Sequence, residues 1–267
     1  MEKFLEHQLD WEDYITGNRL LDICNKTNAT FCKTDYLGEF TDSYHKVFVT
    51  HNSDYHITPH RLERGPKHGW WFAQNKDVVN KRVCSLPIGL ENMTLRDQDQ
   101  AQRGRFSSEV PFALQKALLI DKISSFNLEK TGEVYMNFNI NTYQAERSSV
   151  WKRFEKEKWV KSTLSLPVQQ FYQDLASHRF VISPRGNGID CHRTWEALYL
   201  RTVPIVKHST HMDDFGDLPI YFINDWSELC YNKLNQFYEE QIINGKFDLD
   251  KLKISWWERH ISEKLSE

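Results

Sequence analysis

The stretch from residue 183 to residue 196 holds the side chains of this chain that are best suited to bind an anionic ligand. Its opening loop carries two glycines, which let a ligand approach the backbone closely. A helix is predicted over residues 192–200, so its free N–H groups and the positive end of its dipole face the loop. Arg185 and Arg193 add guanidinium groups that bind phosphate oxygens in pairs. We therefore expect an anion site formed by Ser183, Arg185, Gly186, Asn187, Gly188, Asp190, His192 and Arg193.

Arg193 and Glu196 extend this expectation to a nucleotide sugar. They lie three residues apart, and therefore on one face of the helix. An arginine for the diphosphate and a carboxylate for the ribose hydroxyls are the pair that such a ligand needs. The alternative is an ordinary ion pair on a helix surface beside an ordinary turn. The loop is no P-loop and does not meet the GxGxxG spacing, and the chain has no YxxxK string, which disfavours a nucleotide-sugar epimerase or dehydrogenase.

Short runs of β-branched and aromatic residues alternate with polar loops and helical segments. Strands are predicted over residues 28–36, 46–50, 70–73 and 83–88, and in a second series over 133–140, 178–183, 203–206 and 219–223. Helices are predicted over 145–156, 167–176, 192–200 and 256–266, from Trp226 behind a cap at Asp225, and from near Ser108 with Pro111 in the first turn. This alternation indicates βαβ units and parallel sheets.

The polar segment 96–105 separates the two series and is interpreted as a linker. We therefore predict an α/β fold with two small Rossmann-like domains, residues 1–108 and 109–267, that face each other across a cleft. Ligands of such sheets bind outside the carboxyl ends of the strands. The N-terminal domain is assigned to the acceptor and the C-terminal domain to the nucleotide sugar.

The motifs of the C-terminal half resemble those of a known family. Ser183-Pro-Arg-Gly, Arg193-Thr-Trp-Glu-Ala-Leu and Val203-Pro-Ile-Val follow the order found in exostosin-like glycosyltransferases. Weaker similarity covers VFVTHNSD, WFAQN, PIGLEN and VYMNFNI, and it points to a compact branch found in large algal viruses and bacterial surface-glycan clusters.

The resemblance implies a GT-B fold and an inverting, metal-independent transfer of a sugar from a UDP-sugar to a hydroxyl of an oligosaccharide or glycoprotein glycan. Xylose is one candidate sugar. It also implies that Arg193 holds the diphosphate, Glu196 the ribose, and the loop 183–188 the base and phosphates. The chain shows neither the signal anchor nor the second catalytic domain of animal exostosins, which puts heparan-type substrates in doubt. The competing interpretation is a non-catalytic module that binds a nucleotide sugar or a glycan.

An inverting transfer needs a base that takes the proton of the acceptor hydroxyl. Residues 51–54, His-Asn-Ser-Asp, follow the predicted strand 46–50 and are expected to face the cleft. Asp54 is the first candidate base, His51 the second and Asp35 the third, although Asp54 is equally suited to cap a turn. Arg147, after the strand 133–140, is predicted either to reach the donor diphosphate or to lie on a helix surface.

No metal site and no cofactor besides the donor are predicted. Glycosyltransferases of the other common fold use a D-x-D string after an apolar strand, whereas 97–99 lies in the polar segment and 248–250 between helices, so both strings are interpreted as chance. Five histidines fall between residues 45 and 68, but they lack a cysteine partner or HExxH spacing, so a zinc site is the weaker interpretation. Arginines and a helix N-terminus can stabilise a diphosphate in place of a metal.

The composition excludes several classes of partner and compartment. The 34 Lys and Arg against 37 Asp and Glu leave a net charge of −3, so no nucleic-acid partner is expected. No apolar run is long enough to span a bilayer, and the N-terminus lacks the basic and apolar regions of a secretory signal. The five cysteines are scattered, which suggests reduced thiols. We therefore expect a soluble, cytoplasmic protein, in the host cytoplasm if the source is viral.

Overall fold

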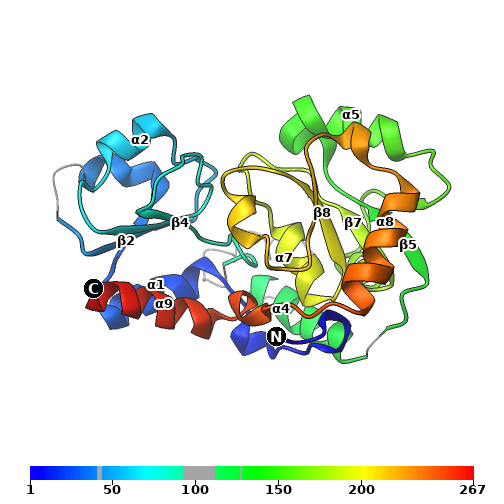
Figure 1. The fold of residues 1–267 in the computed structure, drawn as a ribbon, viewed down its shortest axis with the longest axis horizontal. Helices are drawn as coiled ribbons and strands as arrows, with labels where there is room; N and C mark the ends of the chain where they lie inside the picture. Colours follow the sequence, from blue (N-terminus) through cyan, green and yellow to red (C-terminus); the bar gives the residue numbers. More distant parts are fainter. Residues whose placement is uncertain (41–43, 93–111, 127) are drawn as a thin grey trace.

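The structure is a computed structural model that describes residues 1–40, 44–92, 112–126 and 128–267. It contains two separate parallel β-sheets, each covered by helices, in two lobes that lie side by side (Figure 1). This is the predicted α/β, GT-B-like architecture, so the fold class is confirmed.

The first sheet has four parallel strands in the order β1-β2-β3-β4. They are β1 (Thr30–Lys33), β2 (Val47–His51), β3 (Trp70–Ala73) and β4 (Val83–Ser85). Every residue of β2 is buried, because both faces of the sheet are covered. Val47 and Val49 enter the main core of the molecule, while Phe48 packs edge-on against Trp71 in a smaller core on the opposite face.

Helices from both ends of the chain cover the first sheet. The helix α1 (Gly17–Thr27) and the last helix, α9 (Ile254–Ser266), pack against each other, α1 on β1 and α9 on β2 (Figure 1). The side chain of Thr16 caps α1 by accepting from the backbone N–H of Arg19 at 3.3 Å. The helix α2 (Pro59–Arg64) and the 3₁₀ helix η3 (Thr34–Phe40) close the smaller core. The C-terminal helix therefore returns to the N-terminal sheet.

The second sheet has five parallel strands in the order β6-β5-β7-β8-β9. They are β5 (Gly132–Met136), β6 (Val160–Ser162), β7 (His178–Ile182), β8 (Val203–Lys207) and β9 (Tyr221–Ile223). The chain adds β6 on one side of β5 and then β7 on the other, so the strand order reverses between β5 and β7. Ligands of open α/β sheets bind at such a reversal, outside the carboxyl ends of the strands. The topology thus draws attention to the loops after β5 and β7.

The helices of the second lobe are α4 (Phe112–Ser125), α5 (Gln144–Phe154), α6 (Val168–Ala176), α7 (His192–Tyr199) and α8 (Tyr231–Phe237). The helix α7 connects β7 to β8 and packs against β8 and α4. Its Trp195, Ala197 and Leu198 are buried in the main core. This packing fixes the direction in which the first turn of α7 points.

The predicted strands are confirmed to within a few residues, whereas α1, α2 and β6 were not predicted. The helix predicted from Trp226 is wrong in extent: Asp225 caps a 3₁₀ turn, Trp226–Glu228, and α8 begins only at Tyr231. The predicted helix start near Ser108, the linker 96–105 and the boundary between residues 108 and 109 lie outside the described residues, so the domain boundary stays a prediction. Within the described ranges, no helix is long and apolar enough to cross a bilayer.

Candidate functional site

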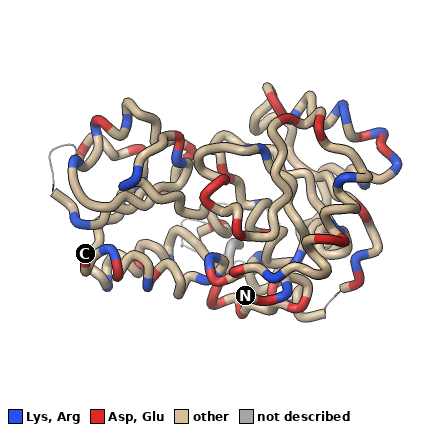
Figure 2. Tube along the Cα trace, viewed as in Figure 1, with Lys and Arg blue, Asp and Glu red and all other residues tan. Residues whose placement is uncertain are grey.

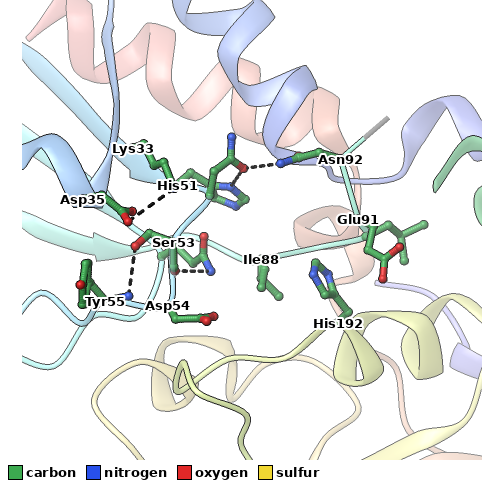
Figure 3. Close-up of a pocket in the computed structure, with 13 residues that line it drawn as sticks. Lys33, Asp35, His51, Ser53, Asp54, Tyr55, Ile88, Glu91, Asn92 and His192 are labelled. Carbon is green, nitrogen blue, oxygen red and sulfur yellow. Dashed lines mark hydrogen bonds and ion pairs between the residues drawn. The ribbon is translucent and has the colours of Figure 1, made fainter. Parts of the chain in front are cut away.

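A cleft with a volume of about 540 Å³ opens at the carboxyl ends of the first sheet (Figure 3). Its walls include Lys33 at the end of β1 and Asp35 after it, residues 51–55 at the end of β2 and in the loop that follows, and Gln74 after β3. His192, the first residue of α7, lines the cleft from the second lobe. The cleft therefore brings loops of the first sheet to the first turn of α7.

Two asparagines turn the chain sharply after β2 and β3. Asn52 and Asn75 have φ angles of 59° and 57°, in the left-handed region that asparagine tolerates better than most residues. Asn75 is fully buried; its side chain donates to the carbonyl of Ser53 and accepts from the backbone N–H of Asp190, both at 3.0 Å. It therefore joins the loop after β2 to the loop after β7.

Asp54, the first candidate base, is exposed in the cleft. Its Oδ2 accepts a hydrogen bond of 3.3 Å from Nδ2 of Asn187, in the loop after β7. A second contact joins the same two loops, because Nη2 of Arg185 donates to Nε2 of His56 at 2.9 Å. Asp54 and Asn187, two predicted site residues from different lobes, are thus in direct contact.

His51, the second candidate base, is buried at the end of β2. Its Nδ1 lies 2.8 Å from Oδ1 of Asn52, and its Nε2 lies 2.9 Å from the carbonyl oxygen of Pro87. Burial lowers the pKa of His51, although both of these contacts oppose the shift. Because both ring nitrogens face partners within the protein, the arrangement favours a role for His51 in positioning the loop.

Arg147, on α5, is buried beneath the loop after β7, so a place on the helix surface is wrong. Its Nε donates to the carbonyl of Arg185 and its Nη1 to the carbonyl of Asn139, both at 2.8 Å. Burial, followed by repulsion from Arg193, lowers the pKa of Arg147 to about 10. The guanidinium holds the loops after β5 and β7 together, and its contact with a diphosphate stays a prediction.

Arg193, in the first turn of α7, lies where the strand order reverses. Its Nε donates to the carbonyl of Asn137 at 2.9 Å, and its guanidinium lies 5.6 Å from the centre of the Phe138 ring. Its Nη1 is buried and has no hydrogen-bond partner among the described residues. A buried donor without a partner is costly, and the contact of Arg193 with a diphosphate stays a prediction.

Glu196 is buried, and its cation is Lys116 rather than Arg193. Its Oε1 accepts from the hydroxyl of Tyr172 at 2.7 Å and lies 3.2 Å from Nζ of Lys116, which also pairs with Glu91 at 3.1 Å. Burial works to raise the pKa of Glu196, but Lys116 and the Tyr172 hydrogen bond outweigh it and lower the pKa. The predicted contact of Glu196 with a ribose stays a prediction.

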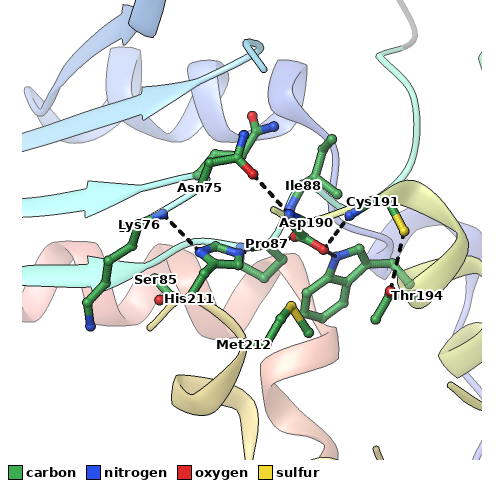
Figure 4. A network of polar contacts seen from close by, with 12 residues as sticks. Asn75, Lys76, Ser85, Pro87, Ile88, Asp190, Cys191, Thr194, His211 and Met212 are labelled. Atoms are coloured by element: carbon green, nitrogen blue, oxygen red, sulfur yellow. Dashed lines mark hydrogen bonds and ion pairs between the residues drawn. The ribbon is translucent and has the colours of Figure 1, made fainter. Parts of the chain in front are cut away.

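Asp190 ends the loop after β7 and is buried in a polar network (Figure 4). Its carboxylate accepts from the backbone N–H groups of Ile88 and Cys191, both at 2.8 Å, and from Nε1 of Trp195 at 2.8 and 2.9 Å. Nε2 of His211 lies 3.3 Å away. With these partners Asp190 ties segment 88–92 to α7, and its predicted contact with the donor is not favoured.

The remaining predicted donor residues support the loop after β7. The hydroxyl of Ser183 bonds that of Thr194 at 3.0 Å, and Nδ1 of His192 lies 2.7 Å from the carbonyl oxygen of Gly89. A Cβ on Gly188 would come within 2.7 Å of the Asn75 side chain, whereas one on Gly186 would make ordinary contacts. Only Gly188 is thus required for the close approach of the two loops.

Gln74, Asn75, Lys116 and His211 were not predicted as site residues. The position of Gln74 and Asn75 at the end of a predicted strand was the available signal. Lys116 and His211 carried none, because Lys116 precedes Glu196 by 80 residues and His211 follows Asp190 by 21, and only the fold brings them together.

The structure also shows the surroundings of the candidate metal ligands, the D-x-D string at 248–250 and the cysteines. Among the described residues, no group of three or more His, Cys, Asp or Glu side chains is arranged to hold a metal ion. Asp248 accepts from the backbone N–H of Asp250 in a 3₁₀ turn, and the string at 97–99 lies outside the described residues. All five cysteines are free thiols. Acidic and basic residues are interspersed over both lobes (Figure 2).

Comparison with known proteins adds little to this geometry. No protein-family model matches the chain, and no curated protein matches it in sequence. The resemblance to exostosin-like glycosyltransferases therefore stays a prediction. The structure is similar to that of UDP-GlcNAc 2-epimerase from Methanocaldococcus jannaschii, with a TM-score of 0.35 and 9% identity over 92% of this chain and 80% of that chain. A TM-score of 0.35 is too low for this likeness to bear on function.

Proposed function

We propose that the protein is an inverting, metal-independent glycosyltransferase that moves a sugar from a UDP-sugar, with xylose as a candidate, to a hydroxyl of a glycan. The observation that carries the proposal is the contact between Asp54 and Asn187. It puts an exposed carboxylate, which lines the cleft of the first lobe, in contact with the loop after β7 that carries Arg185.

In this proposal the donor lies against the second lobe. The diphosphate accepts from Nη1 of Arg193 and faces the first turn of α7, whose dipole favours negative charge. Arg185 is held beside the loop after β2 by its contact with His56 and can add a second guanidinium. Fixed positive groups at the leaving group are the usual means of stabilising a transition state in which a diphosphate departs.

Asp54 acts as the base in this scheme. The acceptor oxygen forms a bond to the anomeric carbon while its proton moves to the Asp54 carboxylate. The bond between the anomeric carbon and the diphosphate breaks, and UDP leaves with the electron pair. His51 supports the loop from below through Asn52 and Pro87.

Calorimetric titration with UDP tests the donor half. We expect Arg193→Ala to weaken UDP binding about 10- to 150-fold, since a charge-assisted hydrogen bond contributes about 1.5–3 kcal/mol. Arg179→Ala is the matched control, because Arg179 is the second residue of β7, at the end of the strand opposite the loop 183–190, and pairs with Glu133. Equal UDP affinity in the wild type and Arg193→Ala contradicts the assignment.

Product analysis by NMR with a UDP-sugar and a glycan panel tests the reaction. Transfer, or slow hydrolysis of the donor, supports the proposal, while UDP binding without either supports the non-catalytic module. Initial rates in EDTA should stay within about twofold of the untreated protein, because arginines supply the positive charge. A collapse in EDTA that Mn²⁺ restores contradicts metal independence.

A further inference from the structure

The wall of the cleft that is formed by the first lobe contains a polar atom without a hydrogen-bond partner among the described residues. Gln74 is 2% exposed and lines the cleft, and its Nε2 donates to the carbonyl of Ser53 at 3.0 Å. Its Oε1 is buried and has no hydrogen-bond partner among the described residues. An amide oxygen in this position costs free energy until a donor reaches it. The wall therefore calls for a ligand that donates hydrogen bonds.

The charged side chains around Gln74 also favour a ligand that donates hydrogen bonds. Asp35, Asp54 and Glu91 line the cleft, and Lys33 is the one ammonium group among the described lining residues (Figure 3). Glu91 is itself paired with Lys116 at 3.1 Å, so Asp35 and Asp54 carry the charge argument. Lys33 is paired with Asp35 at 3.4 Å. Burial works against ionisation of Asp35, but the hydrogen bond from Ser53 and the pair with Lys33 hold its pKa below the usual range. Ionised carboxylates only accept hydrogen bonds, and they repel other anions.

Tyr55 provides an apolar surface at the same wall. It lines the cleft, is 51% exposed, and its ring lies 4.5 Å from the guanidinium of Arg61. A ring fixed in this way suits the C–H face of a sugar, while the surrounding acceptor atoms suit its hydroxyl groups. Hydroxyl donors and an apolar face are the two properties of an uncharged pyranose.

We propose that this wall selects an acceptor sugar that is uncharged and rich in hydroxyl groups, with Gln74 accepting from one hydroxyl, and that it rejects sugars carrying a carboxylate or phosphate. The inference rests on the proposed function and names its acceptor class. It assigns the two lobes to ligands of different charge: the arginines after β7 to the anionic donor, and the carboxylates that line the cleft of the first lobe to a neutral acceptor.

Two pairs of methyl glycosides test the proposal in ligand-observed NMR with the intact protein and saturating UDP. Methyl β-glucoside is compared with methyl β-glucuronide, and methyl β-galactoside with methyl β-galacturonide, so that each pair differs only at C6. We expect a neutral member to bind and its uronate partner to bind at least about threefold more weakly at low salt, with the difference reduced in high salt.

Two variants sharpen the test. Gln74→Met should weaken binding of the neutral glycoside about three- to tenfold, the effect of one lost hydrogen bond, without changing UDP affinity. Asp35→Asn should raise uronate affinity relative to the neutral glycoside, because it removes a negative charge and leaves the Lys33 ammonium in the cleft. Glu258→Gln, on the exposed side of α9, removes the same charge elsewhere and should change neither ratio.

The inference is overturned if a uronate binds as tightly as its neutral partner, if Asp35→Asn behaves like Glu258→Gln, or if no glycoside binds while UDP does. In each case the donor half of the proposed function still stands. If UDP itself does not bind, the proposed function fails first and this inference fails with it.

Discussion

The loops after β2 and β7 both present an aspartate near the cleft, and they use it in opposite ways. Asp190 is 3% exposed, and its carboxylate accepts from Ile88, Cys191 and Trp195. Asp54 is exposed, and it contacts Asn187 at the limit of a hydrogen bond. One carboxylate is saturated with donors from its own protein, while the other keeps the capacity to bind.

This difference in burial separates the aspartate that stabilises the fold from the aspartate that is available for a reaction. A buried carboxylate is tolerated only when its oxygens are bonded, and it then resists removal. A base must instead reach a proton on a ligand, so it needs an accessible oxygen. The same contrast separates Glu196, which is held by Lys116 and Tyr172, from Asp35 at the cleft.

The largest effect that we expect from the different exposure of Asp54 and Asp190 is on turnover. Asp54→Asn should lower kcat about 10²- to 10⁴-fold, the usual contribution of a general base, because an amide cannot accept the proton. UDP affinity should stay unchanged in the same variant, since an amide oxygen still accepts the hydrogen bond from Asn187. Steady-state rates and UDP titration measure the two quantities. Near-normal turnover in Asp54→Asn would leave Asp54 as a turn residue and move the search for the base to Asp35.

The second effect is on stability and should appear only at the other aspartate. Asp190→Ala should lower the free energy of unfolding by about 3 kcal/mol, because it leaves buried N–H donors without an acceptor. Asp54→Ala should change it by less than about 0.5 kcal/mol, as expected for an exposed side chain. Urea denaturation of both variants measures the difference. Equal losses in the two variants contradict the division between structure and chemistry.

The strands could be predicted from the sequence better than the site could. Strands depend on short local segments, whereas the site depends on residues that are far apart in the chain. Strands such as β2 and β3 are specified by local runs, KVFVT and WWFA, whose residues favour buried strands. The helix α1 also had a local signal, a cap at Thr16 before Leu20, Ile23 and Cys24, and could have been predicted. The strand β6, Val-Lys-Ser, holds one apolar residue, whereas the equally short β4 and β9 lie in longer apolar runs, VCSLPI and PIYFI.

The roles of the site residues depend instead on partners that are distant in sequence. The Arg193–Glu196 spacing was correct for one helix face, but Lys116 and Tyr172 arrive from other helices and take the carboxylate. Likewise, the donors that saturate Asp190 include Ile88, 102 residues away. No local pattern distinguishes Asp190 from Asp54, because their different burial arises only when the two lobes pack.

The smallest effect that we expect is on the pH dependence of stability, and it concerns His51. This residue is buried, whereas Asp54, three residues later, is exposed. Burial lowers the pKa of His51 below its ordinary value of 6.5, so the unfolded chain takes up a proton at a higher pH than the native protein does. The contribution of neutral His51 to stability is therefore complete above pH 6.5 and is lost as the pH falls toward the native pKa. The wild type should lose unfolding free energy faster than His51→Gln between pH 6.5 and 5.5, by up to about 1.4 kcal/mol per pH unit.

His45, His178 and His260, whose pKa values burial also lowers, remain in both proteins and cancel in the difference. Parallel curves for the two proteins would mean that the oxygens of Asn52 and Pro87 offset the burial, and that His51 titrates like a histidine in water.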